Sequence, residues 1–141
     1  SSRIWDTASG WFKNPLSDVE SNHIYFKTPT LVERAKNCEK PLIISECGGY
    51  TLKIENHVWN PKAKYGYGSS NSKQELTQKI LQMYKKMIIP AIKHGLSGCV
   101  YTQLSDVEDE INGFYTYDRK VCKVEKESML EIAEEIKRAQ N

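Results

Sequence analysis

Short apolar runs bounded by polar or turn-forming residues recur along this chain, and they predict β-strands. The runs are Arg3–Trp5, Asn22–Tyr25, Leu42–Ser45 and Cys99–Thr102. They are nearly continuous instead of alternating, which is typical of parallel strands that are covered on both faces.

Helical spacing of apolar residues is strongest between residues 73 and 94, where Leu76, Ile80 and Ile88 share one face. Ser72 with Glu75 forms a capping box before this segment, and Gly95 supplies a left-handed stop after it. Pro90 should remove one backbone hydrogen bond and bend the last turns. We therefore expect one long helix here.

Two further helices are expected, at about Thr30–Cys38 and at about Glu127–Ala139. The first should turn Leu31, Val32 and Ala35 inward, and the second Met129, Ile132, Ala133 and Ile136. Strands that alternate with helices predict an α/β fold with a parallel sheet and right-handed crossovers. Two long connections, Gly48–Asn71 and Gln103–Lys126, follow strand carboxyl ends, where parallel α/β folds bind ligands.

Size and charge narrow the possible classes of protein. The 141 residues (16.2 kDa, 39% hydrophobic) suffice for one core but not for two ordinary domains. The longest apolar stretch, Met87–Ile92, is too short to span a membrane. The net charge is only +2, with basic residues scattered among acids, so a nucleic-acid partner is not expected. The first residues contain neither an initiator Met nor a signal peptide, which suggests a processed N-terminus.

Four cysteines lie singly in different segments, without a C-x-x-C pair. This spacing argues against zinc and redox motifs, and we expect no metal and no cofactor. Cys47 and Cys99 adjoin apolar runs and should behave as small buried hydrophobes. This cysteine usage favours a reducing compartment, with a lean to the cytoplasm.

Glu46 is placed unusually, where a buried strand meets the Gly48-Gly49 turn. One interpretation is a strand-terminating Glu that rotates into solvent. The other is a nucleophile or an acid held at the mouth of a barrel. Position alone leaves both interpretations open.

Four blocks of sequence, in this order, resemble the catalytic barrel of glycoside hydrolase family 2, which includes β-galactosidases and β-glucuronidases. The blocks are Trp5–Trp11, Asn22–Tyr25, Ile44–Tyr50 and Val100–Glu108. The resemblance extends from about Arg3 to Val124. It implies part of a (β/α)8 TIM barrel, about strands 5 to 8 with their helices, and a carbohydrate substrate.

The resemblance also assigns two catalytic roles. Glu46 matches the nucleophile at the end of the seventh strand, and Tyr25 matches the tyrosine that orients it from the sixth. Cys47 replaces an aromatic residue often found next to the nucleophile, and Tyr101 lies near the place of a sugar-stacking tryptophan.

Several more residues are expected to bind substrate at the rim: His23, Trp11, Trp59, Tyr101 and Gln103. For His23 the alternative is a satisfied core histidine. For the loop tryptophans the alternative is packing of the loops onto the scaffold. The acidic run Asp106–Glu110 could bind sugar hydroxyls or a cation, but a solvated loop is the expectation.

A retaining glycosidase needs a second carboxyl group, the general acid and base. In the family this residue follows an asparagine, and the chain contains no Asn-Glu dipeptide. A complete barrel also takes about 250 residues. We therefore expect the whole chain, residues 1–141, to be the C-terminal half of a catalytic barrel, an inactive fragment of a larger retaining exo-β-glycosidase of the β-galactosidase type. The alternative is a non-catalytic carbohydrate-binding or interaction domain derived from a barrel.

A half-barrel would have two open strand edges and an inner face that includes some of Ile4, Ile24, Ile43 and Val100. Such edges and apolar faces favour self-association, for example as a two-fold dimer. The competing expectation is a monomer in which the Gly48–Asn71 loop or the C-terminal helix covers the open face.

Overall fold

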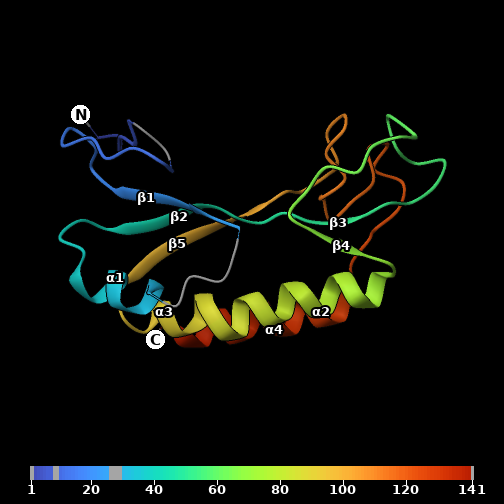
Figure 1. Cartoon of the computed structure of the whole chain (residues 1–141). Helices are drawn as coiled ribbons and strands as arrows, with labels where there is room; N and C mark the ends of the chain where they lie inside the picture. The colour runs from blue at the N-terminus through green and yellow to red at the C-terminus, as the bar shows by residue number, and fades with distance from the viewer. Residues whose placement is uncertain (1, 8–9, 26–29, 141) are drawn as a thin grey trace.

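The computed structural model describes residues 2–7, 10–25 and 30–140. The fold is mixed α/β, with a small parallel sheet on one side and helices on the other (Figure 1). Its strands are β1 (Glu20–Ile24), β2 (Leu42–Gly48) and β5 (Leu96–Thr102). Both neighbouring pairs are parallel, and the order β1-β2-β5 follows the chain. The predicted α/β class with a parallel sheet is confirmed.

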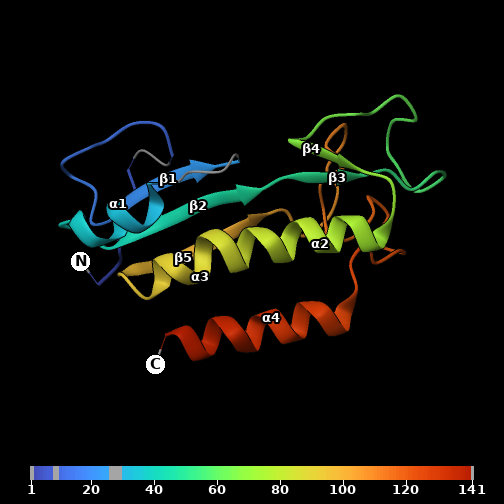
Figure 2. The ribbon, with the colours of Figure 1, turned by 60° about the horizontal axis from the view of Figure 1, so that its bottom comes forward.

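The helices all lie on the same face of this sheet (Figure 1). Helix α1 (Leu31–Asn37) connects β1 to β2, and α4 (Lys126–Ala139) ends the described chain. Between β2 and β5 run α2 (Lys73–Met83), the π-helical turn η1 (Tyr84–Ile88) and α3 (Ile89–Ile92). In Figure 2, α4 lies alongside the α2–α3 rod, which it contacts. The C-terminal helix therefore belongs to the helical layer and does not cover the open face of the sheet.

Helix α2 begins where the capping residues predict. The backbone N–H of Glu75 donates to Ser72 Oγ at 3.0 Å, while the Glu75 carboxylate accepts from the backbone of Asn71 instead of Ser72. The helix runs on through a π-helical turn just before Pro90, in which the N–H of Ile89 donates to the carbonyl of Tyr84. A π-turn interrupts the regular ladder of hydrogen bonds, so the missing N–H of Pro90 is accommodated next to it. Gly95 has φ +106° and ends the helix as expected.

The core lies between the sheet and the helices. Ile44 of β2 is fully buried in the same core cluster as Leu76 and Ile80 of α2. Cys47 is also fully buried, as predicted for a small hydrophobe, whereas Cys99 is only partly buried. From α4 only Ile132 is deeply buried, because the apolar stripe of this helix is narrow. Ala133, which the periodicity placed inward, is exposed.

The first predicted strand, Arg3–Trp5, is wrong. This segment has no strand structure, and Ile4 and Trp5 are 77% and 58% exposed. Trp5 instead exchanges hydrogen bonds with Asp18: its N–H donates to Asp18 Oδ2, and its carbonyl accepts from the Asp18 N–H, both at 2.8 Å. A strand needs a neighbour for its ladder, and this segment has none among the described residues.

The predicted long connection Gly48–Asn71 is also corrected, because it contains two strands. These are β3 (Tyr50–Leu52) and β4 (Gly68–Ser70), which pair in parallel and form a second lobe beyond the carboxyl end of β2 (Figure 1). Three residues are too few to show a period in sequence. No helix in the described part of the chain is long and apolar enough to cross a membrane.

Candidate functional site

Glu46 lies near the carboxyl end of β2, the central strand of the sheet. The strand continues to Gly48, so Glu46 is part of it and does not merely follow it. A register shift in the β1–β2 pairing places His23 directly opposite Glu46. Partner residues on adjacent strands are close enough for their side chains to interact. The Glu46 side chain is 39% exposed, so it remains accessible from the open side of the sheet.

Two side chains from β1 and its carboxyl end contact the same oxygen of Glu46. The hydroxyl of Tyr25 donates a hydrogen bond to Glu46 Oε2, and His23 Nδ1 lies 3.3 Å from that oxygen. Among the residues that the structure describes, no hydrogen bond reaches Oε1. The carboxylate is therefore held through one oxygen while the other is available for chemistry.

Tyr25 is suited to remain a hydrogen-bond donor. Burial raises the pKa of its hydroxyl well above the ordinary value, and the bond to the Glu46 carboxylate raises it further. The Thr102 side chain, at the end of β5, opposes part of this shift in the pKa of Tyr25. The phenol therefore stays protonated across the physiological pH range and donates to the carboxylate continuously.

Aromatic rings surround this carboxylate. Trp11 meets His23 edge to face at 5.7 Å, and Tyr67 stacks on Tyr25 with ring centroids 3.7 Å apart. Gly49 allows the second contact, because a Cβ there would lie 2.7 Å from the Tyr67 ring and 3.1 Å from the Tyr25 ring. Of the predicted substrate-binding residues, Trp11 and His23 are brought to Glu46.

The other predicted substrate-binding residues are placed elsewhere. Trp59 packs against Tyr117 at 5.2 Å in the second lobe. Tyr101 stacks on Phe114 at 4.3 Å and packs against the core. In this structure both aromatic rings have packing partners apart from Glu46.

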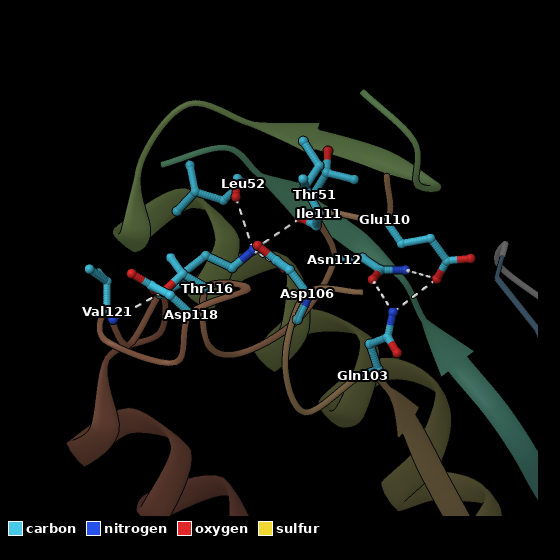
Figure 3. A network of polar contacts seen from close by, with 12 residues as sticks. Thr51, Leu52, Gln103, Asp106, Glu110, Ile111, Asn112, Thr116, Asp118 and Val121 are labelled. Carbon is cyan, nitrogen blue, oxygen red and sulfur yellow. Dashed lines mark hydrogen bonds and ion pairs between the residues drawn. The ribbon is translucent and has the colours of Figure 1, made fainter. Parts of the chain in front are cut away.

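Gln103 is bound within its own loop. Its Nε2 donates to Glu110 Oε2 at 2.9 Å and to Asn112 Oδ1 at 2.8 Å (Figure 3). Sequence reasoning missed this arrangement, for which the Asn112-Gly113 turn was the available signal. Tyr67 is one of the loop aromatics that the sequence offers for stacking on a sugar, and the structure places its ring on Tyr25.

The prediction that the acidic run Asp106–Glu110 forms a solvated loop is wrong for its first residue. Asp106 is buried, and its Oδ1 lies 2.6 Å from Nζ of Lys123, whose side chain is completely inaccessible to solvent. Lys123 also donates to the carbonyls of Leu52 and Ile111, both at 3.0 Å; Figure 3 labels these two residues beside Asp106. The Gly113 N–H donates to Asp106 Oδ1 at 2.8 Å. Burial raises the pKa of Asp106 and lowers the pKa of Lys123, each against the opposing effect of its partner. This pair fixes the loop after β5 to the second lobe.

Within the described part of the chain, no group of three or more His, Cys, Asp or Glu side chains could hold a metal ion. Comparison of the sequence with protein-family models and with curated proteins finds no match.

Proposed function

We propose that this chain carries the nucleophile of a retaining exo-β-glycosidase of the β-galactosidase type. The observation that carries the proposal is the Glu46 carboxylate, held through Oε2 by Tyr25 and His23 with Oε1 unengaged by the described residues, at the carboxyl end of a parallel sheet. Catalytic groups of (β/α)8 barrels occupy that end of the strands. The aromatic rings of Trp11 and Tyr67 beside it are suited to pack against a sugar.

In the proposed reaction, Glu46 Oε1 attacks the anomeric carbon as the glycosidic bond breaks. A general acid, supplied from outside these residues, gives its proton to the departing oxygen, and a covalent glycosyl-enzyme forms. Water, deprotonated by the same group, then displaces Glu46. Tyr25 and His23 keep the carboxylate oriented, which lowers the cost of reaching the transition state.

Three of the four expected strands form one parallel sheet, which supports the proposal of a partial barrel. Its three strands follow chain order with all helices on one face, the arrangement of a barrel wall. The opposite face is more polar than expected: Ser45 Oγ lies 3.3 Å from Ser21 Oγ beside Glu46, and Ile24 faces the helical core. In the described chain β1 and β5 each have one neighbour in this sheet, so each leaves an edge for further strands. We propose that the other half of the barrel covers these edges in the full protein. Where that half is absent, a second copy of this chain covers them.

The alternative is a non-catalytic carbohydrate-binding or interaction domain that keeps exposed rim aromatics such as Trp11 and Trp59 without the chemistry. The coding sequence upstream of Ser1 separates the two proposals. An in-frame Asn-Glu after another apolar strand supports the enzyme, whereas a start codon close to Ser1 supports the binding domain.

The purified 141-residue chain should not hydrolyse aryl β-glycosides measurably. General acid catalysis is typically worth 10²–10⁴-fold, and the missing strands also remove substrate-positioning groups. Release of nitrophenol from paired nitrophenyl β-galactoside and β-glucuronide tests this expectation. Activity should return when the upstream half of the barrel is supplied; hydrolysis by the chain alone would contradict the fragment proposal.

In the enzyme that contains this chain, Tyr25→Phe should lower kcat roughly tenfold to a few hundredfold while the protein stays folded. The substitution removes only the hydroxyl, and a hydrogen bond to a charged group is worth about 1.5–3 kcal/mol. Steady-state kinetics and circular dichroism measure the two effects. Tyr117→Phe, which alters a tyrosine packed on Trp59, is the matched control and should leave kcat unchanged. Unchanged kinetics in Tyr25→Phe would reassign Tyr25 to packing.

A further inference from the structure

A second carboxylate stands at the same end of the sheet as Glu46. Glu110 follows β5 and lines a surface cleft of about 530 Å³, together with Tyr65 and Gln103 among others. The carboxylate is therefore accessible to a ligand in the cleft. An accessible carboxylate beside a tyrosine ring matches the mixture of polar and aromatic groups that binds sugars.

Neighbouring amides hold Glu110 in one orientation. Gln103 Nε2 donates to Glu110 Oε2 at 2.9 Å, and Asn112 Nδ2 lies 3.5 Å from the same oxygen. Figure 3 shows the other carboxylate oxygen pointing away from both amides. Gln103 Nε2 donates to Glu110 and Asn112, so it holds the Glu110 carboxylate in place. That carboxylate lines the cleft together with the carboxylates of Glu108 and Asp109.

The backbone around Glu110 is fixed as well. The carbonyl of Ile111, the next residue, accepts a hydrogen bond from the buried Lys123, and the Ile111 N–H donates to the carbonyl of Tyr65. A ligand-binding group on such a loop loses little freedom when the ligand binds, which favours affinity.

Tyrosine rings connect this cleft to Glu46. The hydroxyls of Tyr65 and Tyr67 are 3.5 Å apart, and Tyr67 stacks on Tyr25, the donor to Glu46. The hydrogen bond with Tyr65 and burial, with smaller effects of nearby charges, together raise the pKa of Tyr67 to about 12. Two adjacent tyrosine rings, Tyr65 at the cleft and Tyr67 against Tyr25, therefore lie between the cleft and the hydrogen bond to Glu46.

We propose that Glu110 is a substrate-binding residue that accepts hydrogen bonds from hydroxyls of the glycoside bound over Glu46, with Gln103 and Asn112 as its positioning residues. The proposal rests on the function proposed above. It specifies the substrate class, because an anionic acceptor attracts hydroxyl donors and repels a second carboxylate. Neutral β-glycosides are therefore favoured over β-uronides.

Thioglycosides test this proposal because they bind without being hydrolysed. The probes are phenyl 1-thio-β-D-galactoside, phenyl 1-thio-β-D-glucoside, their 4-deoxy and 6-deoxy analogues, and phenyl 1-thio-β-D-glucuronide, titrated by calorimetry into the full enzyme. Glu110→Gln should weaken binding of the better neutral ligand about tenfold, since a charged acceptor becomes neutral. The deoxy analogue that lacks the contacted hydroxyl should bind the variant and the wild-type enzyme equally well. The glucuronide should bind the variant more tightly than it binds the wild type.

The exposed Glu39→Gln is the matched control and should change none of these affinities. Gln103→Ala as a single substitution should lower the affinity for the neutral ligands. In the Glu110→Gln background it should cause little further loss of affinity, because Gln103 acts through the same carboxylate. Unchanged affinities in Glu110→Gln, or an equal loss for every probe including the glucuronide, would overturn the proposal. Turnover that survives Glu46→Gln would instead overturn the proposed function, while the Glu110-dependent binding could still be observed.

Discussion

Replacing Glu46 with Gln in the intact enzyme is expected to abolish turnover, with kcat falling by about 10⁴-fold or more, or about 5.4 kcal/mol of barrier. The amide keeps the shape of the side chain and can still accept hydrogen bonds from Tyr25 and His23. It cannot form the glycosyl ester, because an amide oxygen is a poor nucleophile. Steady-state hydrolysis of aryl β-glycosides measures the effect.

Glu20→Gln is the matched control for this substitution. Glu20 is also a strand glutamate of the same sheet, but it lies at the amino end of β1, where it pairs with Lys13 at 2.9 Å. Catalysis belongs to the carboxyl ends of barrel strands, so Glu20→Gln should retain the wild-type kcat. Equal losses in the two variants would mean that the charge of the sheet matters generally and that Glu46 has no special role.

The largest effect on stability is expected at Lys123. Lys123→Met should lower the free energy of unfolding by about 3–5 kcal/mol, because Asp106 would be left as a buried, unpaired carboxylate. The carbonyls of Leu52 and Ile111 would lose a donor as well. Asp106→Asn should also destabilise the fold, and the double variant should lose less than the sum of the two. Urea denaturation of the purified chain provides these values.

Lys36→Met provides the control for loss of a lysine in an ion pair. Lys36 and Glu33 form an i,i+3 pair on the surface of α1, with side chains 45% and 64% exposed. Such pairs are worth at most about 0.5 kcal/mol. A similarly small change in Lys123→Met would show that the buried pair does not hold the loop after β5 against the second lobe.

The sequence predicted the elements whose signals are local. Alternating strands and helices, the Ser72 cap and the Gly95 stop were sufficient for the parallel sheet and the long helix, because each depends on neighbouring residues. Arg3–Trp5 has the composition of a strand, but strand formation requires a partner that composition does not reveal. The strands β3 and β4 escaped notice because each has only three residues.

The site was predictable to a different extent. The sequence blocks directed attention to Glu46 and Tyr25, and the structure places the two in hydrogen-bond contact. The roles of Lys123 and Glu110 depend on long-range contacts: Lys123 meets the carbonyl of Leu52, 71 residues away. No local pattern predicts that a lysine near the end of the chain will be fully buried. A charge of that kind is expected on the surface unless a specific partner is known.

The central claim is that Glu46 becomes covalently attached to the sugar, and trapping the glycosyl-enzyme tests it most directly. A 2-deoxy-2-fluoro-β-glycoside with an activated leaving group slows both chemical steps through its fluorine, while the leaving group keeps formation of the intermediate faster than its hydrolysis. Incubation of the intact enzyme with this reagent, followed by digestion and mass spectrometry, locates the label. We predict one fluoroglycosyl group per enzyme, on Glu46, and none in the Glu46→Gln variant. A label on another carboxylate would contradict the account.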